Sequence, residues 1–140
     1  MTITLLIMAI KKFLEKELAD DMLPIPTVLL GYLNQSTASS AGYPVIMILP
    51  AEGEGATSKD EIQVKLFFGT QSEDSTGLID LLNLMDRVRI LLLRQRVLEQ
   101  KFAMDGSWKW KMNEEHSSSE WGGELTTTWA LPQIRQEVQL

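Results

Sequence analysis

Apolar residues near the start of the chain recur every three or four positions, which is the spacing of one face of an α-helix. The pattern predicts a helix from about Thr4 to Asp20. It ends before Pro24 and Pro26, because proline lacks a backbone donor and clashes with the preceding turn. The opening run also looks like a signal sequence, but Lys11 and Lys12 follow the apolar run and do not precede it. We therefore interpret it as the first turns of this helix. The positions expected to face the core are Leu6, Ala9, Ile10, Phe13, Leu14 and Leu18.

Four later segments have the patterns of β-strands. The apolar run Tyr43–Pro50 is bracketed by prolines, as expected for a buried strand whose ends cannot continue a ladder. Residues Glu61–Gly69, Trp108–Met112 and Leu125–Leu131 alternate between two faces, which is typical of a half-buried strand. The stretch Ile25–Leu33 is compatible with a further short extended segment.

Polar or glycine-containing segments between these elements are predicted to be loops. Gln35–Gly42 is rich in serine, alanine and glycine, and Ala51–Ser58 carries two glycines and two glutamates. Asn113–Gly123 carries three serines and two glycines. The final segment, Gln133–Leu140, is expected to be either helical or a loose tail.

A second, longer helix is predicted to begin at Ser72–Ser75, where acidic groups and hydroxyls suit the positive end of a helix dipole, and to run to about Gln100. One apolar stripe on this helix suits the core. It consists of Leu78, Leu81, Leu82, Met85, Val88 and Leu92. A second apolar strip beside it consists of Ile79, Ile90, Leu93 and Val97. A helix with a single core contact does not need the second strip, so it is either a wider core contact or a subunit interface.

The order of helix, strands, long helix and strands predicts an α+β fold. We expect a mostly antiparallel sheet packed by the N-terminal helix and one long central helix. At 140 residues, of which 44% are hydrophobic, residues 1–140 fit a single domain with a substantial core.

The sequence offers little that could carry out chemistry. It has no cysteine, which excludes thiolate metal sites and thiol nucleophiles. Its only histidine, His116, lies in a polar turn, where neighbouring serines and glutamates do not form an oriented catalytic triad. The acidic residues around it lack the ligand spacing of zinc or EF-hand sites, and Gly53–Gly55 lacks the lysine of a P-loop. We therefore predict a protein that is not an enzyme and has no metal or cofactor.

Charge and aromatic residues bear on nucleic-acid binding. The formal net charge of −6 argues against a nucleic-acid-binding domain, although four arginines lie between positions 87 and 96. Trp108 and Trp110 share one side of a predicted strand, with lysines on the other side. Such tryptophans can stack on single-stranded bases, but they are more often sheet core. We favour the core interpretation.

A family resemblance rests on the order of elements and their hydrophobic pattern between Ile7 and Pro132. A first amphipathic helix precedes the strand at Tyr43–Ile48. The strand Ile62–Gly69 then leads directly into a long helix through Asp86–Arg89, and the chain closes with a hairpin from Trp108 to Trp129. In this respect the chain resembles the tail terminator proteins of long-tailed bacteriophages and prophages, and the wider group of head–tail joining and neck proteins.

The resemblance implies a structural role in virion assembly. Members of that family form a ring, usually a hexamer, that caps the tail tube, ends its polymerisation and joins the tail to the head. The implied partners are further copies of the chain, the tail tube protein and head-connector proteins. DNA would at most pass through without specific binding, and no membrane is involved. The implied locations are the host cytoplasm during assembly and the tail or neck of the virion.

The three predicted loops are the candidate contact and docking segments in this interpretation. Together with the second apolar strip, they give the candidate subunit-interface residues Ile79, Ile90, Leu93, Val97, Glu52, Glu54 and Trp121. Two other functions stay open. One is a small ligand- or nucleic-acid-binding module that uses the Trp108/Trp110 face, and the other is a hydrolase that uses His116.

Overall fold

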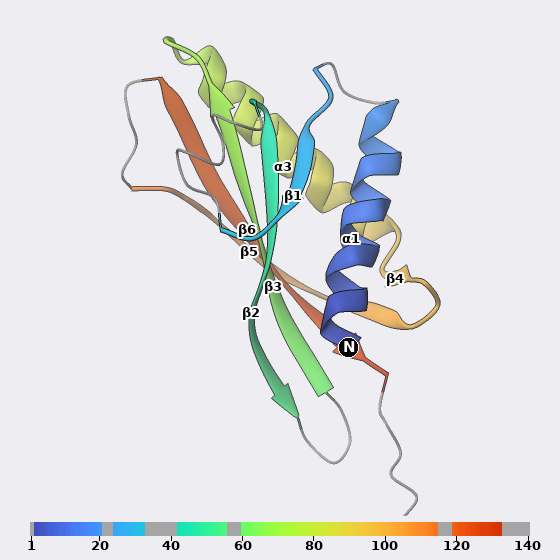
Figure 1. Cartoon of the computed structure of the whole chain (residues 1–140). Helices are drawn as coiled ribbons and strands as arrows, with labels where there is room; N and C mark the ends of the chain where they lie inside the picture. The colour runs from blue at the N-terminus through green and yellow to red at the C-terminus, as the bar shows by residue number, and fades with distance from the viewer. Residues whose placement is uncertain (1, 21–23, 33–41, 56–59, 115–118, 133–140) are drawn as a thin grey trace, which may run out of the picture.

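A computed structural model describes residues 2–20, 24–32, 42–55, 60–114 and 119–132 of the protein (Figure 1). These residues form two long helices and the strands of one sheet. In chain order the elements are α1 (Thr2–Ala19), β1 (Thr27–Leu30), β2 (Val45–Gly55), β3 (Asp60–Gln71), α3 (Thr76–Arg94), β4 (Val97–Leu98), β5 (Phe102–Met112) and β6 (Glu120–Leu131).

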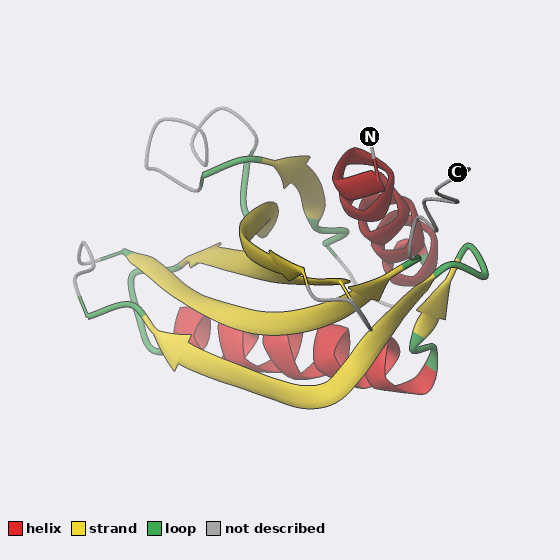
Figure 2. Cartoon of the chain, turned by 90° about the horizontal axis from the view of Figure 1, so that it is seen from below, coloured by secondary structure: helices red, strands yellow, loops and turns green. Residues whose placement is uncertain are grey.

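The described strands form one six-stranded sheet in the order β1-β2-β3-β6-β5-β4. β1 runs parallel to β2, and every other neighbouring pair is antiparallel. The sheet is strongly curled, and Figure 2 shows it bending like half a barrel. The predicted α+β fold, with a mostly antiparallel sheet and two helices, is confirmed.

Both helices pack on the same face of the sheet. α1 lies against β1 and β2 and reaches β4, whereas α3 lies against β3, β6 and β5. Apolar side chains from both helices join those of the strands in one core cluster around Phe68 and Trp129, which are fully buried. A smaller cluster on the opposite face contains Val45 and Met47. The helix positions predicted to face the core from α1 are buried, apart from the half-buried Phe13.

A short chain of buried polar groups connects β6 to β3 inside this core. The indole Nε1–H of Trp129 donates to Thr127 Oγ1 at 2.9 Å, and that hydroxyl donates to the carbonyl oxygen of Val64 at 3.0 Å. Thr127 is only 1% exposed, so neither group can turn to water. Within the described residues no buried side-chain nitrogen or oxygen lacks a partner. These two hydrogen bonds therefore give the indole N–H of Trp129 a partner inside the core, so the buried tryptophan leaves no polar group unpaired.

The start of α3 agrees with the prediction, but its end does not. Asp74 Oδ1 accepts the Thr76 N–H at 2.9 Å. Hydrogen bonds from the side chains of Thr76 and Ser72, and then this backbone bond, hold the pKa of Asp74 below its usual value. The helix ends at Arg94, not near Gln100. Two consecutive residues, Glu99 and Gln100, have positive φ angles of 53° and 58° and turn the chain into β5. The apolar spacing continues from Leu93 to Val97, past the end of the helix at Arg94, so the periodicity alone overestimates the helix.

Two predicted loops are partly strand. Ala51–Gly55 continues β2 and pairs with β3 as far as Gly55↔Asp60. A side chain at Gly53 would lie 2.5 Å from Ile62 Cδ1, so this glycine permits close strand pairing and does not mark a loop. Likewise, Glu120–Gly123 belongs to β6 and pairs with β3. Backbone pairing needs no apolar side chain, which is why the hydrophobic pattern missed both extensions.

Of two other predicted strand boundaries, one differs from the structure and one agrees. β5 begins at Phe102, six residues before the predicted strand at Trp108. The extended segment predicted within Ile25–Leu33 is present as β1. The predicted loop Gln35–Gly42, apart from Gly42, lies outside the described residues, as do positions 56–58 and 115–118 and the tail Gln133–Leu140.

The buried polar chain makes a testable prediction for stability. Thr127→Val keeps the side-chain shape but leaves the indole N–H of Trp129 without its acceptor, so we expect a loss of about 1–3 kcal/mol in the free energy of unfolding. Thr128→Val, on the same strand but half-buried, is the matched control and should change stability by less than about 0.5 kcal/mol. Urea denaturation measures both, and equal stabilities of the two variants would contradict the prediction.

Candidate functional site

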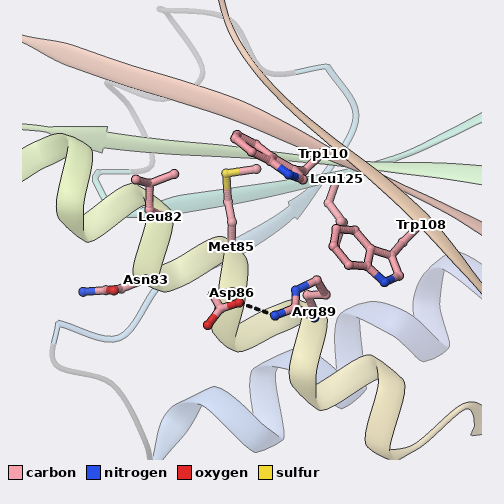
Figure 3. Close-up of a pocket in the computed structure, with 8 residues that line it drawn as sticks. All are labelled: Leu82, Asn83, Met85, Asp86, Arg89, Trp108, Trp110 and Leu125. Atoms are coloured by element: carbon pink, nitrogen blue, oxygen red, sulfur yellow. Dashed lines mark hydrogen bonds and ion pairs between the residues drawn. The ribbon is translucent and has the colours of Figure 1, made fainter.

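The described surface carries two grooves lined by exposed apolar side chains. The first, which we call the α3–β5 groove, has a volume of about 350 Å³. Figure 3 shows the side chains that line it, with the two tryptophans of β5 facing the helix α3. They are Leu82, Asn83, Met85, Asp86, Arg89, Trp108, Trp110 and Leu125.

The charged groups in the α3–β5 groove are engaged with one another. The Arg89 guanidinium donates to Asp86 Oδ1 in an ion pair one helical turn apart. Its Cζ also lies 4.7 Å from the centroid of the Trp108 ring, within the range of a cation–π contact. These contacts fix the walls of the groove.

The strand that carries these tryptophans has an open outer edge. β4 pairs with β5 only at Val97↔Ala103 and Leu98↔Phe102. Among the described residues, no strand pairs with the outer edge of β5 beyond that point. An uncovered edge presents backbone donors and acceptors to any incoming strand.

The second groove, which we call the α1–β1 groove, lies between α1, the other edge strand β1 and the turn that leads into β5 at Phe102. Its volume is about 490 Å³. Its apolar lining includes Leu5 and Met8 of α1 and Leu30 of β1, which are 51%, 54% and 42% exposed. Its charged lining is Lys11, Lys12, Glu15, Glu99 and Lys101. Lys11 pairs with Glu15 on the same helix.

The structure divides the second apolar strip that the sequence placed on the long helix. Ile79 is 56% exposed, whereas Ile90 and Leu93 are half-buried, and Leu93 packs against the core. Val97 is 50% exposed but lies on β4, because α3 has already ended. The four residues therefore do not form one continuous helical face, and for Leu93 the wider core contact is correct.

Two of the remaining candidates lie on the β2–β3 hairpin, and the third does not. Glu52 and Glu54 are exposed on the part of β2 that continues past its pairing with β1, while β3 stays paired with β6 on its other side as far as Asp60↔Leu131. Trp121 is half-buried, and its Nε1–H donates to the carbonyl oxygen of Ser72 at 3.2 Å. A Cβ added at Gly77 would lie 2.3 Å from Trp121 Cδ1. Trp121 thus packs on the start of α3 in its own chain.

The core interpretation of Trp108 and Trp110 is wrong. They are 37% and 54% exposed, although their side chains face the same side of the sheet as the core. The reason is that α3 lies mainly over β3 and β6. It leaves β5 uncovered from Asp105 to Lys111. Leu82, placed in the core stripe by its spacing, is 40% exposed for the same reason. Alternation of apolar and polar residues shows which side chains share a face of the strand, but it does not show whether a helix covers that face.

Side chains that could ligate a metal ion do not cluster in the described part of the chain. Among them, no group of three or more histidine, cysteine, aspartate or glutamate side chains could hold a metal ion. His116 lies outside the described residues. Burial and the nearby Glu120 carboxylate raise the pKa of Tyr43. No helix in the described part of the chain is long and apolar enough to cross a membrane.

Comparison with known proteins identifies no family for the chain. No protein-family model matches the chain, and no curated protein gives a significant sequence match.

The packing of Trp121 predicts the effect of a small substitution. Alanine is normally favoured over glycine in a helix by about 1 kcal/mol. At Gly77, however, the added methyl group displaces Trp121, so we expect Gly77→Ala to destabilise the fold by about 1–3 kcal/mol. In a Trp121→Ala background the same change should cost less. Denaturation of the four chains of this double-mutant cycle measures the coupling, and an uncoupled or stabilising Gly77→Ala would show that Trp121 does not hold α3.

Proposed function

We propose that the chain is a self-assembling structural subunit that works by contact with copies of itself, as the tail terminator proteins it resembles do. The observation that carries this proposal is the presence of two separate apolar grooves on one small chain. One has Trp108 and Trp110 on its wall, and the other has Leu5, Met8 and Leu30. Exposed apolar surface of this kind commonly marks a protein interface.

Two different grooves favour a head-to-tail contact. A symmetric dimer uses the same patch twice and would leave the other groove exposed. When patch A of one copy meets patch B of the next, both are covered in every copy, and repetition by rotation closes a ring. This is the arrangement that the resemblance to tail terminators implies.

The rest of the surface fits a ring at the end of a phage tail tube. Glu52 and Glu54 are exposed on the β2–β3 hairpin and are available to a tail tube protein or a head-connector protein. The net charge of −6 suits a channel through which DNA passes without being held. In this role the chain ends tube polymerisation and joins the tail to the head.

A second candidate function has one observation in its favour. The exposed tryptophans of the α3–β5 groove could stack on a small planar ligand or on single-stranded bases. Arg89 already stacks on Trp108, however, and is paired with Asp86. Lys109 and Lys111 point to the other face of the strand, and the acidic whole disfavours phosphates. We therefore rank assembly first.

The head-to-tail arrangement predicts how variants behave in native mass spectrometry or light scattering. The unaltered chain should form a species larger than a dimer. Trp110→Glu and Leu5→Glu should each prevent this, because each places a charge in one groove. An equal mixture of the two variants should form dimers and nothing larger, since only one intact pair of grooves is left.

The control is Gln71→Glu, which adds the same charge at an exposed position outside both grooves and should leave assembly unchanged. An unaltered chain that stays monomeric at all concentrations would contradict the proposal. Quenching of tryptophan fluorescence by oligonucleotides, reversed at high salt, would support the binding module instead.

A further inference from the structure

The open edge of β5 presents the backbone of the residues that carry its exposed side chains. Asn113 N–H donates to the carbonyl oxygen of Gly122 at 2.9 Å, which makes these two residues a hydrogen-bonded antiparallel pair. Because such pairs alternate along a ladder, Lys111 and Lys109 also bond inward to β6. The N–H and C=O groups of Trp108, Trp110 and Met112 therefore point outward from the sheet.

β1, the strand at the other edge, also points the backbone N–H and C=O groups of alternate residues outward from the sheet. Thr27 N–H donates to Pro44 O at 3.0 Å, and Gly31 N–H donates to Ile48 O at 2.9 Å. In a strand with this parallel pairing, the alternate residues Val28 and Leu30 direct their backbone groups outward. Val28 belongs to the core on the helix side of the sheet, and Leu30 lines the α1–β1 groove on the same side.

The outward residues of the two edges therefore carry side chains on the same face. Directly opposed residues of neighbouring strands place their side chains on one face of the sheet. Antiparallel pairing of the β5 edge with a β1 edge would put Val28 and Leu30 opposite two of the three outward residues of β5. The helices of both copies would then lie on the same side of a continuous sheet.

The directions of the two edge strands also allow antiparallel pairing between copies. β1 is parallel to β2, and three antiparallel steps lead from β2 through β3 and β6 to β5. β1 and β5 therefore run in opposite directions. A second copy that is rotated about an axis along the strands, without being inverted, brings its β1 antiparallel to the β5 of the first. Three strands separate the two edges within one chain, so the partner is another copy.

The exposed side chains complete the fit. At such a junction Trp108 and Trp110 would face Leu30 and enter the α1–β1 groove of the next copy, where Leu5 and Met8 are exposed. The groove of about 490 Å³ has room for indole rings. On the other face of the junction, Lys109 and Lys111 would lie beside Leu29, and they tolerate exposure.

From these observations we infer that copies of the chain join by strand addition, with β5 of one copy pairing antiparallel to β1 of the next and the two tryptophans of β5 filling the α1–β1 groove. This inference rests on the proposed assembly function and names its contact. Two registers place both outward residues of β1 opposite outward residues of β5. In one Leu29 lies opposite Lys109, and in the other it lies opposite Lys111.

Disulfide trapping tests the junction, because the natural chain has no cysteine. Leu29→Cys is co-expressed with Lys109→Cys or with Lys111→Cys, and the oxidised products are separated by gel electrophoresis without reductant. We expect a band at twice the monomer mass in one of the two combinations. Each single variant alone should give no such band. Leu29→Cys with Met112→Cys is the matched control, because those side chains lie on opposite faces and should not join.

The outcomes separate this inference from the proposed function. A native mass larger than a dimer with no cross-link at Lys109 or Lys111 overturns strand addition and leaves assembly standing. An equally strong band with Met112→Cys, or a dimer from one variant alone, also overturns it. A chain that is monomeric at all concentrations overturns both. Circular dichroism and thermal unfolding of each variant, expected to match the natural chain, exclude misfolding as the cause of a negative result.

Discussion

Two helices cover one face of a sheet that is wider than they are, and the rest of the molecule depends on this mismatch. α1 lies against β1 and β2 and α3 mainly against β3 and β6, so β5, the fifth strand in the order, is covered only in part. Curling brings the sheet around the helices and buries Phe68 and Trp129 completely. The outer half of β5 is still left beyond α3. The exposed tryptophans are therefore a consequence of the architecture and not a local irregularity.

The sequence predicted those helices and strands that have one face in the core and the other toward solvent. The core positions of α1 and the alternating positions of β3 and β6 follow directly from whether each side chain faces helices or solvent. Boundaries set by the backbone were not predictable in this way. α3 ends at Arg94, where Gln95 leaves the helical conformation with φ −119° and ψ 80°, although the apolar spacing continues to Val97. The hairpin around Gly53 is held by strand pairing, which the hydrophobic pattern does not report.

The candidate site was predictable only in part, because exposure is a property of the whole fold. A core tryptophan and an uncovered tryptophan have the same alternating sequence, so Trp110 could be assigned to a face of β5 but not to solvent. The expected strip on α3 failed for a related reason. It assumed a helix that continues to Val97, whereas Leu93 already turns toward the core and Ile79 stays outside. Only the tertiary arrangement brings Leu82 of α3 beside the tryptophans of β5.

The energetics explain why strand pairing and apolar burial would both be needed at the junction. Four backbone hydrogen bonds, from the two outward residues of β1, contribute about 2–6 kcal/mol. Two half-covered tryptophans that each lose about 100 Å² of exposed surface add about 5 kcal/mol. The loss of translational and rotational freedom on association costs about 4–15 kcal/mol, so a single contact is only marginally stable. In a closed ring the last subunit makes two contacts for one loss of freedom, since its second contact is intramolecular. A weak pairwise junction can therefore still favour a closed ring over an open dimer.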